Sequence, residues 1–129
     1  MTGGKGKVTG SSSHDMQKEP LNIEFSDYEG KKIILISGDI DMYSSPWLRK
    51  SIMTLVGEKT SPLLVDFGNV SYIDSSGIAT FVEGLKGMMS FGGKLVFFNI
   101  PNGVMEIFTF SKLDKVFTIC GTLHDAANS

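Results

Sequence analysis

The heptapeptide YIDSSGI, residues 72–78, stands where an apolar strand pattern ends and a helical pattern begins. Asp74 is predicted to cap the helix, because its carboxylate can accept hydrogen bonds from the free N–H groups of the next residues. Two serines then place hydroxyl groups at the helix start, and Gly77 removes side-chain bulk so that another group can approach closely. Because aspartate and serine are also ordinary capping residues, the pattern is typical either of a phosphorylation site or of a plain helix cap.

Strand and helix patterns alternate on both sides of this heptapeptide. Apolar and polar residues alternate from Leu21 to Phe25, and a turn at residues 27–30 leads into the β-branched run from Ile33 to Ile36. The other expected elements are a helix at 46–56 capped by Ser45, a strand at 63–65, a longer helix from 75 that Gly92 stops, a strand at 95–98, a short helix opened by Pro101, and a strand at 116–119. The order ββαβαβαβ predicts an α/β fold with a mixed sheet of about five strands.

The order of the elements also predicts where the loops lie. Parallel strands joined by right-handed crossovers place their C-terminal ends on one edge of the sheet. The loops at residues 38–43 and 72–77 are therefore expected to share this edge, which brings Asp39 and Asp41 near Ser75. Trp47 is expected near the same edge, where an exposed aromatic side chain serves a protein contact.

Composition narrows the classes of function. The chain has 129 residues, of which 41% are hydrophobic, and a formal net charge of −2. This charge argues against a nucleic-acid partner, and no stretch is long and apolar enough for insertion in a membrane. A single cysteine, Cys120, cannot form an internal disulfide, and no leading apolar segment resembles a secretory signal, so a cytoplasmic protein is expected.

Residues 1–19 differ in composition from the rest of the chain. Glycine, serine, threonine and lysine dominate there, which predicts a disordered arm ahead of a single domain at residues 20–129. The run GGKGK at residues 3–7 does not match a phosphate-binding loop, because no strand pattern precedes it and no helix pattern follows it.

The sequence has partial similarity to two protein families that are phosphorylated on aspartate. The strand leading to Asp39 and Asp41 is faintly similar to the start of haloacid-dehalogenase phosphatases, but a glycine separates strand and aspartate, and Tyr43 stands where threonine or valine is usual. In a receiver domain Asp66 would accept the phosphate, yet no lysine ends the strand where that family requires one. An acyl phosphate on Asp39 or Asp66 would support these alternatives.

Other catalytic arrangements do not assemble from the sequence. His14 lies in the predicted arm, His124 in the polar tail and Cys120 on a predicted strand, so no nucleophilic triad forms. The cysteine and histidine count excludes an ordinary structural zinc site, and no cofactor or metal is expected. The sequence therefore predicts a protein that is not an enzyme.

The chain resembles the STAS domain, and within that family the bacterial anti-sigma factor antagonists. The resemblance runs from about Asn22 to Ile119, and its most specific part is residues 65–78. The GDID sequence at residues 38–41, ahead of a capped helix, and GGKL at residues 92–95 support it. The closing helix of the family is expected to be short here, because residues 121–129 allow only a turn or two.

The resemblance implies a phosphorylation switch. Ser75 matches the serine that the partner anti-sigma factor, itself a kinase, phosphorylates, while Ser76 aligns with the following hydroxyl and is the less favoured acceptor. Unmodified protein would bind the anti-sigma factor and release a sigma factor, phosphorylation would end binding, and a phosphatase would restore it. The expected partner-binding residues are Asp39, Asp41, Tyr43, Asp74, Ser75, Ser76, Gly77 and Ile78.

An alternative keeps the fold without the switch. The chain would then be a STAS interaction subunit, for example of a lipid-transport ABC complex or of a stress-signalling assembly. The edge that carries Ser75 would be a docking surface with no obligatory modification.

Overall fold

A computed structural model describes residues 21–129, and the predicted arm at residues 1–19 lies outside the described residues. Five strands form one sheet in the order β2-β3-β4-β5-β6, accompanied by four α-helices. The elements are β2 (Asn22–Tyr28), β3 (Lys31–Ile40), α1 (Ser45–Gly57), β4 (Leu63–Ile73), α2 (Ser75–Met89), β5 (Leu95–Phe98), α3 (Asn102–Phe110), the 3-10 turn η1 (Leu113–Lys115), β6 (Thr118–Cys120) and α4 (Leu123–Ala127). The α/β fold, its mixed sheet and the order of the elements are confirmed.

The sheet is antiparallel only at its first pair of strands. β2 pairs antiparallel with β3 through a tight turn, and β3, β4, β5 and β6 are all parallel neighbours. Parallel neighbours require a crossover connection, and α1, α2 and α3 supply the three crossovers. The C-terminal ends of β3 and β4 therefore lie at one edge of the sheet, with the starts of α1 and α2 beside them.

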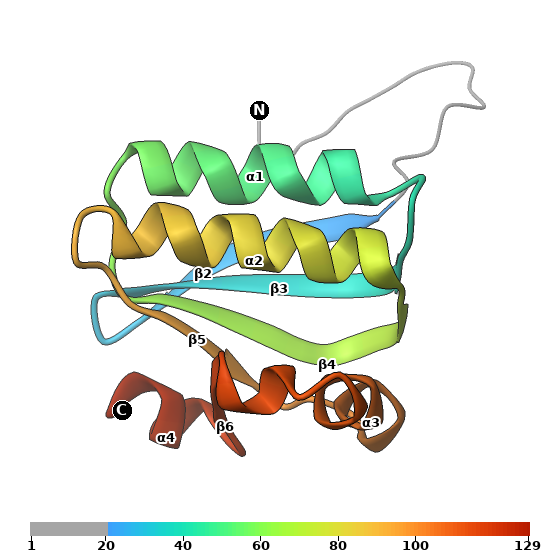
Figure 1. Cartoon of the computed structure of the whole chain (residues 1–129). Coiled ribbons are helices and arrows are strands. Elements are labelled where there is room, and N and C mark those ends of the chain that lie inside the picture. The colour runs from blue at the N-terminus through green and yellow to red at the C-terminus, as the bar shows by residue number, and fades with distance from the viewer. Residues whose placement is uncertain (1–20) are drawn as a thin grey trace.

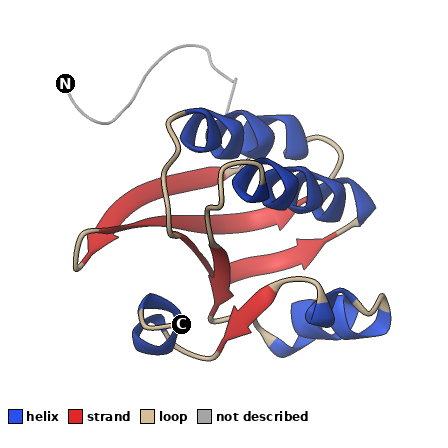
Figure 2. Ribbon diagram, turned by 60° about the vertical axis from the view of Figure 1, so that its left-hand side comes forward, coloured by secondary structure: helices blue, strands red, loops and turns tan. Residues whose placement is uncertain are grey.

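Helices cover the two faces of the sheet unequally. α1 and α2 lie side by side over one face, whereas the short α4 lies on the opposite side (Figures 1 and 2). Ile34 and Ile36 face the larger core under α1 and α2, while Ile33 faces a smaller cluster with Ala126 and Ala127 of α4. Burial on both faces explains why this part of β3 is a continuous apolar run.

Phenylalanine side chains fill the centre of the larger core. The buried rings are Phe67, Phe81, Phe97, Phe108 and Phe117, with neighbouring centroids 4.7 to 5.9 Å apart. Tilted and edge-on aromatic pairs at these distances add to the energy of apolar burial. The rings come from β4, α2, β5, α3 and the residue before β6, so they join these elements into one core.

Two strands differ from the sequence-based boundaries. β4 continues from Leu63 to Ile73, well beyond the predicted residues 63–65, because its second half also pairs with the long strand β3. The last strand begins at Thr118 rather than at Val116. The η1 turn precedes it, and Phe117 stacks on Phe97 with centroids 4.7 Å apart before the pairing of β6 with β5 begins.

Candidate functional site: the edge shared by the α1 and α2 turns

The turns that lead into α1 and α2 touch each other at the C-terminal edge of β3 and β4. The Asp74 N–H donates to the Ile40 carbonyl at 3.0 Å, and the Ser45 and Ser76 hydroxyl oxygens are 3.0 Å apart. The expectation that the two loops share this edge is therefore confirmed. Neither turn can move far without breaking a contact with the other.

Asp74 caps α2, as the sequence predicts. One of its carboxylate oxygens accepts from the Ser76 N–H at 2.9 Å, from the Gly77 N–H at 3.3 Å and from the Ser76 hydroxyl at 2.6 Å. The hydrogen bond from the Ser76 hydroxyl is the largest cause that lowers the pKa of Asp74, backbone N–H groups add to it, and burial opposes it. Asp74 is therefore a carboxylate at neutral pH.

The two serines of this turn have different surroundings. The Ser76 hydroxyl donates to Asp74, and the Ser76 side chain is half-buried. Ser75 is exposed, and its hydroxyl forms no hydrogen bond with any residue from 21 to 129. The arrangement thus holds one hydroxyl within the cap and presents the other to solvent.

Gly77 serves packing rather than the approach of another molecule. It is buried, and a β-carbon built there would lie 2.5 Å from Cγ2 of Ile40 and 2.8 Å from Cγ1 of Ile73. The expectation that this glycine admits an external group is corrected: the groups that approach it are the ends of β3 and β4. Ile78 is half-buried and packs against the same core.

The turn into α1 is also held by serines, but both are buried. Ser44 donates to the Asp39 carbonyl at 2.8 Å and accepts from the Asp41 N–H at 2.9 Å, while Ser45 donates to the Asp41 carbonyl at 2.6 Å. The N-cap position is Ser44 rather than the predicted Ser45, which is the first helical residue. The shift of one residue arises because Ser45 turns its hydroxyl back towards Asp41 and across to α2.

The two aspartates of this turn differ in what they bind. The Asp41 carboxylate accepts from the N–H groups of Tyr43 at 2.9 Å and Ser44 at 3.0 Å, so it stabilises the turn itself. Asp39 is exposed, and only its carbonyl takes part in the hydrogen bonds of the turn. Both acidic residues belong to the same edge as Ser75, in the arrangement that the sequence predicts.

Exposed apolar side chains lie in or next to the same two turns. Tyr43 is 79% exposed, Met42 66%, Tyr72 48% and Trp47 38%. Aromatic residues and methionine are enriched in protein–protein interfaces, and a group of exposed apolar side chains indicates a site of contact with another molecule. Tyr43 and Trp47 are expected at this edge from the sequence, whereas Met42 and Tyr72 are not. The signal for Met42 was the apolar pair that it forms with Tyr43 directly after residues 38–41.

The geometry contradicts a receiver-type acceptor. Asp66 lies inside β4, whose last residue is Ile73, and not at the end of a strand as that alternative requires. Its carboxylate accepts from the Gly68 N–H at 2.8 Å and from the Asn99 side chain at 3.3 Å. Within residues 21–129, no three His, Cys, Asp or Glu side chains lie close enough together to hold a metal ion.

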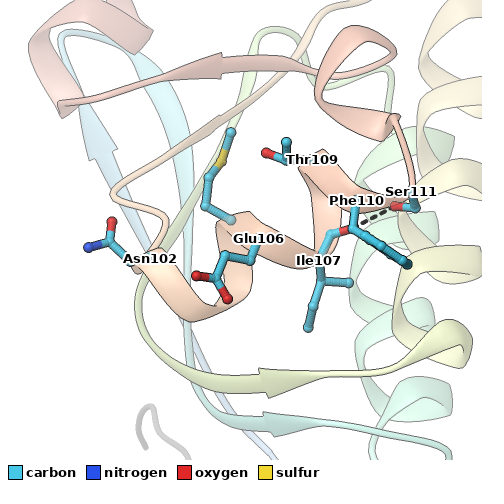
Figure 3. Close-up of a pocket in the computed structure, with 7 residues that line it drawn as sticks. Asn102, Glu106, Ile107, Thr109, Phe110 and Ser111 are labelled. Carbon is cyan, nitrogen blue, oxygen red and sulfur yellow. Dashed lines mark hydrogen bonds between the residues drawn. The ribbon is translucent and has the colours of Figure 1, made fainter.

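A second surface feature lies on α3, outside the shared edge. The close-up in Figure 3 draws the outer side of this helix, where Phe110 is 91% exposed and lies beside a shallow hollow with Glu106 and Ile107. The sequence analysis did not single out this surface. Of the helices formed by residues 21–129, none is both long enough and apolar enough to cross a bilayer.

Comparisons with known proteins agree with this fold. The family model for the STAS domain matches residues 22–126. An anti-sigma-B factor antagonist of Bacillus subtilis is 30% identical over 99 residues, which cover 77% of this chain and 90% of that protein. A crystal structure of an anti-sigma factor antagonist from Mycobacterium paratuberculosis has a TM-score of 0.77 at 22% identity, covering 87% of this chain and 95% of that one. The phosphorylated form of the Bacillus cell fate determinant SpoIIAA has a TM-score of 0.62 at 19% identity, covering 84% and 96%.

Proposed function

We propose that this chain, which belongs to the STAS domain family and to its anti-sigma factor antagonists, is switched off by phosphorylation of Ser75. As an antagonist it is a regulatory binding protein and not an enzyme, and its partner is an anti-sigma factor. The unmodified form binds that partner and so releases a sigma factor. The similarity to named antagonists favours this function over a non-switching subunit of a transport or stress-signalling complex.

The exposed hydroxyl of Ser75, which forms no hydrogen bond with residues 21–129, is the observation that carries the proposal. Ser75 is exposed and the Ser76 hydroxyl is bound to Asp74 at 2.6 Å, so phosphorylation of Ser75 breaks no hydrogen bond of the cap. Phosphorylation of Ser76 would break that bond and would modify the oxygen that lies 3.0 Å from the Ser45 hydroxyl oxygen. Ser75 is therefore the acceptor, and Ser76 is a structural residue.

Electrostatic repulsion accounts for the loss of binding. A phosphate adds about −1.5 to −2 charges to an edge that already carries Asp39, Asp41 and Asp74. Like charges brought together at an interface cost several kcal/mol, and each 1.4 kcal/mol is about a tenfold loss of affinity. The helix start itself tolerates an anion, because its N–H groups and dipole favour negative charge, so the fold need not change.

The expected partner-binding residues have two roles: some contact the partner directly, and the others keep the contact residues in position. Ser75, Tyr43 and Asp39 are exposed and make direct contacts. Five further residues hold those contacts in place through the cap, the turn and the packing beneath them: Asp41, Asp74, Ser76, Gly77 and Ile78. Met42, at 66% exposure, extends the contact surface beside Tyr43.

The proposed cycle needs two further activities. The anti-sigma factor supplies the kinase that modifies Ser75, and a phosphatase acting on the phosphoserine restores binding. Both act on a surface that is open to solvent, and the proposed cycle takes place in the cytoplasm.

The proposal is tested with the anti-sigma factor from the same genome. Incubation with this partner and ATP is expected to give one phosphoserine, which the substitution Ser75→Ala removes and the matched control Ser76→Ala retains. In a binding assay, Ser75→Ala is expected to bind like the wild type, and Ser75→Asp at least tenfold more weakly. Phosphate on Ser76, or equal binding by Ser75→Ala and Ser75→Asp, would exclude the proposed switch.

A further inference from the structure

β2 is an edge strand of the sheet that residues 21–129 form. It pairs with β3 along one side, and no other strand within residues 21–129 pairs with its other side. All seven residues of β2 pair with β3 without a register shift, whereas the pairing of β3 with β4 contains two such shifts. β2 therefore presents a straight row of backbone N–H and C=O groups that can pair with another strand.

Monomeric proteins protect such an edge. They use charged side chains, lysine above all, proline, a β-bulge or a very short strand to prevent pairing with another chain. β2 is seven residues long and has no lysine, proline or bulge; its charged residues, Glu24 and Asp27, are the one protection of this kind that it carries. Asp27 also forms an ion pair with Lys32 of the same hairpin, with oxygen and nitrogen 3.3 Å apart.

An apolar surface lies directly beside this edge. Phe25, in the middle of β2, is 50% exposed, and it lines a groove next to α1 together with Trp47, which is 38% exposed, and Leu55. The groove has a volume of about 580 Å³. An edge strand and an adjoining apolar groove together form a surface on which a partner strand can form backbone hydrogen bonds and also bury side chains.

The sequence of β2 is complementary to itself in one antiparallel register. With the two-fold axis at Phe25, each Phe25 lies opposite Phe25 of the second copy, Glu24 opposite Ser26, and Ile23 opposite Asp27. No like charges then face each other, and an aromatic pair lies at the centre, which is a favourable cross-strand arrangement. An axis at Glu24 would place two carboxylates opposite each other, and an axis at Ser26 would lose the aromatic pair, because Phe25 would then lie opposite Asp27.

We propose that this chain forms a two-fold symmetric dimer through antiparallel pairing of β2 with β2 of a second copy. The two five-stranded sheets then become one continuous sheet, and both Phe25 side chains are covered at the mouths of the two grooves. An interface in which the same patch is used by both copies is the commonest way that proteins form dimers.

The dimer does not depend on the proposed switch. β3 lies between β2 and β4, so the end of β4 and Ser75 are two strand spacings, about 10 Å, from the paired edge. Both copies can bind a partner at their Ser75 edge while the sheets remain joined. The dimer would stand even if Ser75 were never modified.

The first test is the mass of the full chain in solution. Light scattering and sedimentation are expected to give twice the chain mass at high concentration, with dissociation on dilution. Phe25→Lys is expected to reduce the mass to that of one chain, while circular dichroism reports whether the variant remains folded. A single-chain mass for the wild type at every concentration, or a dimer that a folded Phe25→Lys variant retains, would overturn the proposal.

A cysteine pair tests the register. Directly opposite residues of antiparallel strands have Cα atoms about 4.5–5.5 Å apart, within the range that a disulfide spans. In a Cys120→Ala background, Phe25→Cys is expected to form a covalent dimer on oxidation. The control Ser26→Cys is not, because Ser26 faces the other side of the sheet and lies opposite Glu24. Cross-linking of Ser26→Cys instead of Phe25→Cys would overturn the register.

Hydrogen exchange of the wild type tests the same edge without a substitution. The outward N–H groups of β2 are expected to exchange slowly at high concentration and quickly on dilution. Slow exchange at every concentration in a protein of single-chain mass would mean that another segment of the chain covers β2, and the dimer would be excluded.

Discussion

The turns into α1 and α2 are two versions of one design, a strand followed by an aspartate, two serines and a helix. In the α1 turn both serines are buried, with exposures of 1% for Ser44 and 6% for Ser45, and their hydroxyls donate to the carbonyl groups of Asp39 and Asp41. In the α2 turn Ser76 has the same kind of role, but Ser75 is exposed. The difference between the two turns is a single hydroxyl group that faces solvent.

This difference indicates which serine can be phosphorylated without a loss of stability. A hydroxyl that satisfies buried polar groups cannot be modified unless those groups find other partners. An exposed hydroxyl without such bonds can be modified, and the modification then changes the affinity for a binding partner but not the stability of the fold. The α1 turn is structural by this criterion, and the α2 turn combines a structural cap with a modifiable residue.

The largest expected effect concerns the packing beneath the α2 turn. Gly77→Ala is expected to lower the free energy of unfolding by about 3 kcal/mol, because the new methyl group meets Ile40 and Ile73 at the ends of two strands. Gly103→Ala is the matched control: it lies in α3, no atom is within 4 Å of the added carbon, and no loss of stability is expected. Urea unfolding measures both. Equal stabilities would mean that α2 does not require close contact with the sheet.

The next effect separates the two turns directly. Ser44→Ala is expected to lower the free energy of unfolding by about 1–2 kcal/mol, because the Asp39 carbonyl and the Asp41 N–H lose the buried Ser44 hydroxyl as their partner. Ser75→Ala is expected to change stability by less than about 0.5 kcal/mol, as for most exposed positions. Denaturant unfolding of the two variants gives the comparison. Similar losses in both would show that the Ser75 hydroxyl has a structural role.

A smaller effect, which depends on pH, tests the cap. Asp74→Ala is expected to lower the free energy of unfolding by about 1 kcal/mol at neutral pH, the usual effect of losing an N-cap side chain. Because the hydrogen bond from Ser76 lowers the pKa of Asp74 in the folded state, this stabilisation is present above the ordinary value of 3.8 and is lost as pH falls through the lowered value. The difference in the free energy of unfolding between the wild type and Asp74→Ala should therefore be smaller at acid pH. Unfolding curves at pH 7 and pH 2 measure it, and a difference that grew in acid would contradict this role.

The smallest effect concerns the ion pair that joins α1 and α2 away from the turns. Arg49 donates two hydrogen bonds to the Glu83 carboxylate, at 2.7 and 2.6 Å, and both side chains are exposed to solvent. Glu83→Gln is expected to reduce stability slightly at low salt and not at all in molar salt, because solvent and ions screen such pairs. Thermal unfolding at two salt concentrations measures this, and a loss that persisted in high salt would indicate a larger role than exposure suggests.

Much of the architecture was predictable because apolar periodicity is local information. The pattern at residues 75–89 fixes both the type and the length of α2, and the run at residues 95–98 gives β5 with its observed bounds. The second half of β4 was not predictable in this way. Its exposed glycine, asparagine and serine residues resemble a turn, and they remain extended because they pair with β3.

The sequence alone also determined the candidate site: which loops meet, which aspartate caps α2, and which two serines stand at the helix start. Only the tertiary structure decided that Ser75 is open while Ser76 is bound, that Gly77 faces Ile40, and that β2 is left at an edge beside an exposed Phe25. The physical reason is that strand and helix formation follow from neighbouring residues, whereas exposure and hydrogen-bond partners depend on groups that are distant in the chain and adjacent only after folding.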